Sequence, residues 1–170
     1  KIIDKVIRLK LQGIASSKIF YWHDIIGYNY KMTNICASIG VAQLKRIKII
    51  LKKKRNLYNR YFQALKNIPI QFQEESIDSI NSYWLVGGIV KNKNIRTNLM
   101  KFLKNCGVET RPGFYPIHTM PMYKKLSKNK FPIASELGSR IICLPSSPDI
   151  SNKKIDYICS KIKEFFKDES

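Results

Sequence analysis

A run of polar and aromatic residues stands at positions 22–34, directly before a segment with helical periodicity. Gly27 to Asn34 read Gly-Tyr-Asn-Tyr-Lys-Met-Thr-Asn, which brings phenol, amide and ammonium groups to the helix start. The first turn of a helix offers unpaired backbone N–H groups and the positive end of the helix dipole, and both favour an anion. Tyrosine hydroxyls and asparagine amides can also donate to phosphate oxygens. The run therefore fits a phosphate site, and an ordinary Asn-containing turn before a capped helix is the alternative.

A second candidate loop runs from Arg111 to Tyr123. Three prolines stiffen it, and Arg111, Tyr115 and His118 supply polar groups. A preorganised loop with a guanidinium and aromatic rings suits a diphosphate and a ring. The alternative is a structural loop whose aromatic side chains cover the core.

The spacing of residues does not support other kinds of active site. The two histidines, His23 and His118, stand far apart, and no Ser-His-Asp set, glycine-rich phosphate loop or metal-ligand cluster can be assembled. The four cysteines are widely separated, with no Cys-x-x-Cys pair, so we expect reduced thiols and no metal site. Cys106 and Cys159 stand beside apolar helical positions, which predicts that both are small buried hydrophobic residues.

The composition is that of a globular protein, with one unusual feature. Of the 170 residues, 44% are hydrophobic and 25% are charged, and the formal net charge is +19. A polyanion partner is one interpretation of that charge. We favour a solvated, lysine-rich surface, because the lysines accompany many Ile and Asn residues, as in AT-rich genomes. Nucleic-acid binding is thus not expected. No apolar run is long enough to span a membrane. The start lacks both a signal-peptide pattern and an initiator Met, so we expect a partial chain of a cytoplasmic protein.

The elements that must position these groups indicate an α/β fold with a small sheet. A short helix ends at Gly13, and a long amphipathic helix runs from Thr33 or Asn34 almost to Pro69. After it, strands alternate with helices. We expect strands at 70–73, 83–90, 108–110 and 141–144, a helix capped by Asn94 and ended by Gly107, a short helix at 134–140, and a final helix capped by Ser151.

Several ordered motifs together resemble the DegT/DnrJ/EryC1/StrS aminotransferase family. That family usually has Gly-Tyr-Asn-Tyr-Arg-Met-Thr-Asn where this chain has residues 27–34, followed by Ile-Gly-x-Ala-Gln-Leu, found here at 39–44. Residues 109–112 and 115–123 match the family's late loop, and 144–148 match its last strand and turn. The motifs cover nearly the whole chain. The residues in these motifs most resemble those of the branch that aminates a GDP-linked 4-keto-6-deoxy sugar.

The resemblance implies a fold and an activity. The fold would be α/β: the C-terminal small domain and connecting long helix of a fold type I aminotransferase dependent on pyridoxal 5'-phosphate (PLP). Residues 1–32 would end the large PLP-binding domain and form an interface loop. Residues 33–67 would be the connecting helix, and 68–170 the small domain. The enzyme would be a homodimer with a shared active site, using glutamate and a nucleotide-linked keto sugar in surface polysaccharide synthesis.

The resemblance also implies roles for individual residues. Asn29 would bind the phosphate of the partner subunit's PLP. Lys31 replaces a family arginine near the donor carboxylate or the substrate, and it keeps the charge but loses the bidentate fork. The remaining implied contacts to the nucleotide-sugar are those of Tyr30, Arg111, Tyr115 and His118. Gly113 replaces a bulkier family residue, and Trp22 and His23 would be structural or interface residues.

The family's Schiff-base lysine, which holds the aldimine and moves the proton, would lie before residue 1. We therefore assign no catalytic residue within this chain and expect it to be inactive alone. Three alternatives stay open at this point: a PLP-dependent sugar 3-dehydratase with His in place of that lysine, a degenerate non-enzymatic partner subunit, and a basic nucleic-acid-binding module.

Overall fold

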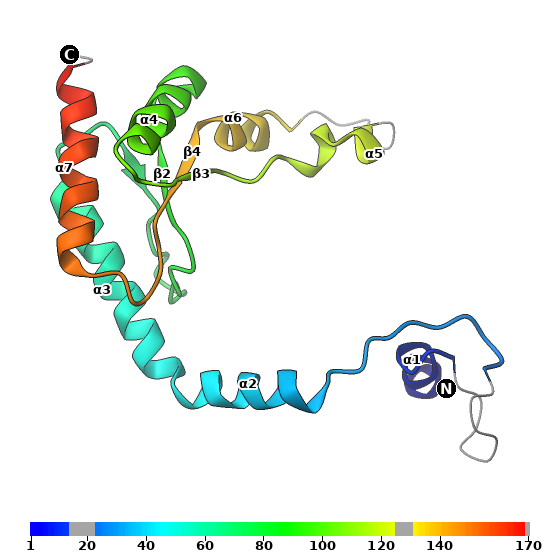
Figure 1. Cartoon of the computed structure of the whole chain (residues 1–170). Coiled ribbons are helices and arrows are strands. Elements are labelled where there is room, and N and C mark those ends of the chain that lie inside the picture. Colours follow the sequence, from blue (N-terminus) through cyan, green and yellow to red (C-terminus); the bar gives the residue numbers. More distant parts are fainter. Residues whose placement is uncertain (14–22, 125–130, 169–170) are drawn as a thin grey trace. The chain divides into compact units, whose positions relative to one another are not determined.

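The computed structural model describes residues 1–13, 23–124 and 131–168 (Figure 1). The chain divides into two compact units, Lys1–Ile47 and Lys48–Ser170. This boundary falls inside the predicted connecting helix, so most of that helix belongs with the C-terminal unit. Among the described residues, no helix is both long and apolar enough to cross a membrane.

The N-terminal unit contains α1 (Ile2–Lys10) and α2 (Asn34–Lys45), and residues 27–33 before α2 form an extended segment. That segment pairs with the end of α1: Tyr28 N–H donates to the Leu9 carbonyl at 2.7 Å, and Gln12 N–H donates to the Tyr28 carbonyl at 3.1 Å. A Cβ at Gly27 would lie 2.2 Å from the Gly13 nitrogen, so only glycine permits this approach. The backbone around Asn29 is therefore held in place by α1.

The helix expected at 33–67 is two helices. Thr33 caps α2 as predicted, since its side chain accepts from Cys36 N–H at 3.3 Å. At Arg46, however, the backbone N–H bonds to the Gln43 carbonyl three residues earlier, and α3 (Ile47–Leu65) begins after it. The prediction of one continuous helix was wrong because the apolar spacing continues across the junction. The predicted apolar stripe is also only partly buried, since Leu44 is exposed.

In the C-terminal unit, α3 and α7 lie side by side next to a four-stranded sheet, and α4 packs against α7 (Figure 1). The sheet is antiparallel throughout, with strand order β1-β2-β4-β3. The elements after α3 are β1 (Gln71–Phe72), β2 (Val86–Ile89), α4 (Lys93–Asn105), β3 (Arg111–Pro112), the 3₁₀ helix η1 (Ile117–Thr119), α5 (Pro121–Lys124), α6 (Pro132–Arg140), β4 (Ile141–Leu144) and α7 (Asn152–Asp168).

The two faces of the sheet differ in burial. Val86, Ile142 and Leu144 point into the core shared with α3, α4 and α7. On the other face, β4 residue Cys143 pairs with Gly87 of β2 and with Arg111 of β3. Residues directly opposite each other on antiparallel strands point to the same side. Gly87, Cys143 and Arg111 therefore form a row across the less buried face.

Several local predictions are confirmed. Strand β4 has the predicted bounds, Ser151 accepts from Lys154 N–H at the start of α7, and Gly107 has a positive φ of 75° after α4. The apolar stripe of α7 is buried as expected: Ile155, Ile158, Ile162 and Phe165.

Other boundaries were predicted wrongly. The strand expected at 108–110 lies at Arg111–Pro112 instead, and Asn92, not Asn94, caps α4 by accepting from Ile95 N–H at 2.9 Å. Asparagine is a good cap at either position, so local preference alone does not choose between them.

The buried thiol of Cys159 predicts a loss of stability in alkali. Its side chain is 3% exposed, and burial, followed by the charge of Asp156, raises the pKa of its thiol from 9.0 to about 11. The unfolded chain therefore releases this proton first, and unfolding is favoured as the pH rises from 9 to 11. Across this pH window the free energy of unfolding should fall by about 2–3 kcal/mol less in Cys159→Ala than in the natural chain, at 1.36 kcal/mol per pKa unit. Urea unfolding at pH 8, 9, 10 and 11 measures the difference.

The exposed Cys36 provides the matched control. Cys36→Ala removes a thiol from an exposed position of α2 and controls for the loss of a cysteine as such. If the free energy of unfolding falls equally steeply with pH in the natural chain and in Cys159→Ala, the Cys159 thiol does not contribute to the loss of stability in alkali.

Candidate functional site

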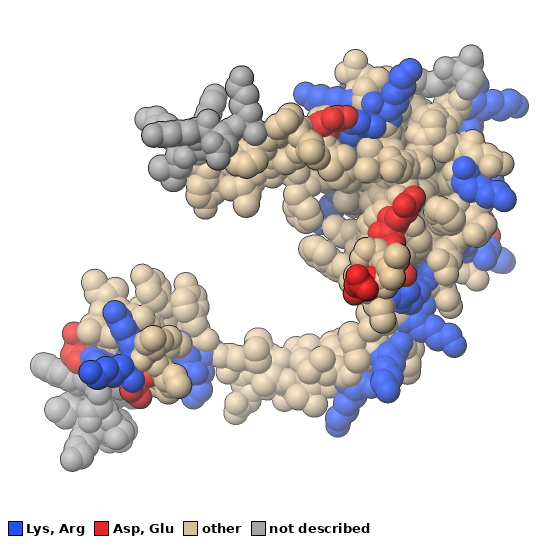
Figure 2. All heavy atoms as spheres, turned by 180° about the vertical axis from the view of Figure 1, so that it is seen from behind, with Lys and Arg blue, Asp and Glu red and all other residues tan. Residues whose placement is uncertain are grey.

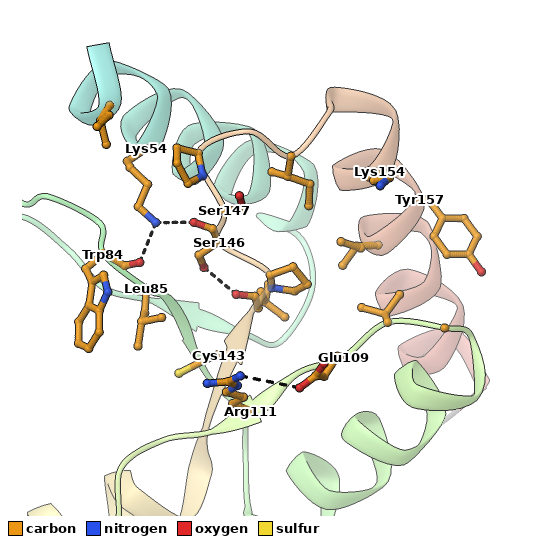
Figure 3. Close-up of a pocket in the computed structure, with 18 residues that line it drawn as sticks. Lys54, Trp84, Leu85, Glu109, Arg111, Cys143, Ser146, Ser147, Lys154 and Tyr157 are labelled. Carbon is orange, nitrogen blue, oxygen red and sulfur yellow. Dashed lines mark hydrogen bonds and ion pairs between the residues drawn. The ribbon is translucent and has the colours of Figure 1, made fainter. Parts of the chain in front are cut away.

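An open cavity of about 920 Å³ lies in the C-terminal unit between α3, β4, α7 and the segment 107–111 (Figure 3). Its walls are largely apolar, with a few polar groups at fixed positions. Lys54 reaches in from α3, Arg111 from β3, and Ser146 from the turn after β4. A cavity of this size with a few convergent polar groups is the usual form of a small-molecule site.

Lys54 is a buried lysine that holds two walls of this cavity together. The residue is 8% exposed, and its Nζ donates to the Trp84 carbonyl at 2.7 Å and to the Ser146 carbonyl. Burial lowers the pKa of the Lys54 ammonium. The Ser146 hydroxyl in turn accepts from Val86 N–H at 2.9 Å and donates to the Leu144 carbonyl at 2.6 Å. Lys54 thereby connects α3 to the start of β2 and to the end of β4.

Sequence reasoning did not single out Lys54, although a signal was present. Lys54 stands three, four and seven residues before Leu57, Tyr58 and Tyr61, which are all buried. It therefore occupies the inward face of α3, where a lysine needs hydrogen-bond acceptors.

Arg111 carries an accessible guanidinium at the edge of the sheet. Its side chain is 82% exposed, and its one ion-pair partner among the described residues, Glu109, lies 3.9 Å away and is equally exposed. Such exposed pairs contribute little energy, so Arg111 is available to another anion. Beside it, Gly113 is buried, and a Cβ there would lie 2.7 Å from the Ile141 Cβ. The close approach of Ile141 therefore leaves little room for a side chain at position 113.

The other residues predicted from the second loop do not line this cavity. Tyr115 lines a separate cavity beside α4. The His118 ring bonds through Nε2 to the Ser135 hydroxyl at 3.0 Å and lies 5.0 Å from the Phe131 ring, which ties η1 to α6. The structure therefore gathers Arg111 with Lys54 but does not bring Tyr115 or His118 to the same cavity.

The first loop presents Asn29 on an ordered extended segment. Tyr28 and Tyr30 stack, with ring centroids 5.4 Å apart and planes 14° apart. Alternate residues of an extended chain point to opposite sides, so Asn29 and Lys31 face away from this stack. The Asn29 amide is exposed and has no hydrogen bond to the part of the chain that the structure describes. An exposed amide of this kind can donate to a phosphate oxygen.

His23 and Trp22 precede this segment. His23 Nδ1 lies 2.9 Å from the Gln12 carbonyl, as expected for a structural role, while Trp22 lies outside the described residues. Elsewhere among residues 1–13, 23–124 and 131–168, no group of three or more His, Cys, Asp or Glu side chains could hold a metal ion.

Basic side chains occupy several separate groups on the face of the C-terminal unit that Figure 2 shows. Some are paired with acids: Arg60 with Asp156 at 2.6 Å and Arg55 with Glu75 at 2.7 Å. Nucleic-acid binding is better served by one continuous basic face with aromatic residues.

The small antiparallel sheet, its three flanking helices and the preceding helical unit form an α/β fragment of the PLP-dependent aminotransferase fold, as predicted. The chain belongs to the DegT/DnrJ/EryC1/StrS aminotransferase family, whose model matches residues 1–163. Aminotransferases of this family depend on PLP, which confirms the predicted cofactor class.

Two similar relatives are GDP-perosamine synthases. The chain is 45% identical over 168 residues to that of Vibrio cholerae, covering 97% of this chain and 46% of the relative. It is 43% identical over 168 residues to that of Escherichia coli O157:H7, covering 99% and 45%. Among solved structures, the aminotransferase TlmJ from Streptoalloteichus hindustanus superposes with a TM-score of 0.86 at 20% identity, over 97% of this chain and 44% of that one. The chain thus spans about half the length of the relatives it matches.

Proposed function

We propose that this chain is the C-terminal part of a PLP-dependent sugar aminotransferase. The enzyme transfers the amino group of glutamate to a GDP-linked 4-keto-6-deoxy sugar, as a perosamine synthase does, in the cytoplasm and for surface polysaccharide synthesis. The observation that carries the proposal is the identity of 43–45% to two GDP-perosamine synthases over nearly the whole chain.

In this proposal the enzyme is a homodimer with shared active sites. The N-terminal unit exposes large apolar side chains, which the upstream half of the same chain and the partner subunit would cover between them in this proposal: Ile3, Val6, Ile35, Ile39 and Leu44. The ordered segment 27–30 would present the Asn29 amide to the phosphate of the partner's PLP. The cofactor itself supplies the electron sink for transamination. Asn29 contributes only binding and orientation.

Arg111 is the residue we assign to the nucleotide-linked sugar. Its accessible guanidinium can donate two parallel hydrogen bonds to a diphosphate or carboxylate. Gly87 and Cys143, which share its row on the sheet, are too small to cover it. Lys54 is assigned a positioning role, because it holds the Trp84 and Ser146 walls in place. Tyr30, Lys31, Tyr115 and His118 remain assigned by the family resemblance alone.

The experiment uses the full-length protein that carries this chain, with glutamate and the GDP-linked 4-keto-6-deoxy sugar. Mass spectrometry should detect the amino sugar together with stoichiometric 2-oxoglutarate. Loss of the C3 hydroxyl without amination would instead identify the sugar 3-dehydratase. The proposal would be contradicted if the protein made in the cell consisted of these 170 residues alone, without the upstream lysine.

Substitution of Asn29 tests the shared site. Asn29→Ala should weaken PLP retention about 10- to 100-fold in the full-length protein, because a hydrogen bond to a charged phosphate contributes roughly 1.5–3 kcal/mol. Equilibrium dialysis with detection of PLP absorbance measures the change. Asn98→Ala, on the exposed side of α4, is the control and should retain PLP fully. Unchanged affinity in Asn29→Ala would remove this residue from the cofactor site.

A further inference from the structure

A second cavity, of about 790 Å³, lies between α4 and the segment 107–115. It shares residues 107–109 with the cavity that holds Arg111, but its other walls differ. Arg96, Lys101 and Lys104 line it from α4, and Thr110 and Tyr115 line it from the segment around β3. None of these residues has a role in PLP binding or in amino transfer in the proposed function, except that the family resemblance assigns Tyr115 to the substrate.

Arg96 is the feature that distinguishes this cavity from an ordinary basic groove. The residue is 8% exposed, and its Nη1 donates to the Gly138 carbonyl at 3.2 Å. Its Nε is buried and has no hydrogen-bond partner in the described part of the chain. No carboxylate of the described residues forms an ion pair with it. A guanidinium has five N–H donors, and burial without an anion is costly.

The surrounding groups favour a compact anion. The charged residues in the lining are Arg96, Lys101 and Lys104 against Glu109 alone, which leaves an excess of positive charge. Lys101 and Lys104 are three residues apart, one turn of α4, and both line the cavity together with Arg96. The hydroxyls of Thr110 and Tyr115 add further hydrogen-bonding groups. Guanidinium, ammonium and hydroxyl donors around one buried cation are the groups that bind phosphoryl oxygens.

We propose that this cavity is a binding site for the phosphoryl group of a small metabolite, with Arg96 as its central ligand. Lys101 and Lys104 attract and hold the anion at the exposed end, and Tyr115 lies at the same cavity. The site is separate from the Arg111 cavity, and it does not depend on the chain being part of an aminotransferase.

The test measures anion binding to the full-length, PLP-loaded protein that carries this chain by isothermal titration calorimetry, with inorganic phosphate, inorganic pyrophosphate and glycerol 3-phosphate as separate probes. At least one probe should bind the natural chain, and Arg96→Met should weaken it at least 10-fold. Tightest binding of glycerol 3-phosphate would identify a phosphate monoester as the ligand. Tightest binding of pyrophosphate would identify a diphosphate, and tightest binding of phosphate the free ion.

The controls separate this site from general attraction to a chain of charge +19. Lys153→Ala removes an exposed lysine of α7 outside both cavities and should leave affinity unchanged. The double variant Lys101→Ala, Lys104→Ala changes only exposed positions and should weaken binding 3- to 10-fold, so it decides the matter if Arg96→Met fails to fold. The proposal is overturned if no probe binds the natural chain, if Arg96→Met folds and binds as tightly as the natural chain, or if Lys153→Ala weakens binding as much as the double variant.

Discussion

Replacement of Arg111 by alanine in the full-length enzyme should lower kcat/KM for the nucleotide-linked sugar about 100-fold. The expected loss corresponds to about 2.7 kcal/mol, the size expected when a charged hydrogen-bond donor to an anionic substrate is removed. The guanidinium is available for this role, because its only described ion-pair partner, Glu109, lies 3.9 Å away at an exposed position. Stopped assays of 2-oxoglutarate formation at several sugar concentrations measure kcat and KM separately.

Arg111→Lys distinguishes charge from geometry. A lysine keeps the positive charge but cannot form the bidentate contact, so we expect a loss of about 10-fold, between those of the natural enzyme and Arg111→Ala. Lys153→Ala, at an exposed position of α7, is the control and should keep full activity. If Arg111→Ala and Lys153→Ala both have the kcat/KM of the natural enzyme, Arg111 does not bind the substrate.

Lys54→Met should lower the free energy of unfolding of the chain by about 3 kcal/mol. Methionine has a similar length but no donor, so the Trp84 and Ser146 carbonyls each lose the hydrogen bond that Lys54 supplies. An acceptor left without its donor in a buried position costs roughly 1–3 kcal/mol. Relief from burying the ammonium offsets part of that cost. Urea unfolding followed by circular dichroism measures the change.

The neighbouring Lys53 provides a matched comparison. Its side chain is 45% exposed and pairs with Asp149 at 2.7 Å at the surface. Lys53→Met should therefore change the free energy of unfolding by about 0.5 kcal/mol or less, as is usual for surface ion pairs. Equal losses for the two variants would show that Lys54 does not join the walls of the cavity.

The elements with strong local signals could be predicted from the sequence. In α7 the apolar spacing repeats without interruption and a serine precedes the helix, and the predicted face is the buried one. In β4 a short apolar run follows a helix, and the strand has the predicted bounds. Gly107 was predicted as the end of α4 because a positive φ there favours glycine. The family was also evident, because its motifs occur in order along nearly the whole chain.

The tertiary structure decided which of these residues meet. The sequence placed Arg111, Tyr115 and His118 in one loop, but Arg111 lines one cavity, Tyr115 another, and His118 bonds to Ser135. The chain leaves β3 and enters η1 between these residues, so side chains that are close in sequence face different parts of the folded unit. Local spacing carries no information about those surroundings.

The sequence by itself determined the family, the cofactor class and the helices and strands whose periodicity is unbroken. Only the tertiary structure showed how Lys54 and Arg96 are accommodated as buried cations, because helical spacing can place a cation on an inward face but does not say which acceptors it meets there. Both form hydrogen bonds to carbonyls distant in sequence, at Trp84, Ser146 and Gly138. Such contacts depend on how strands and helices pack, and that packing is a property of the folded unit as a whole.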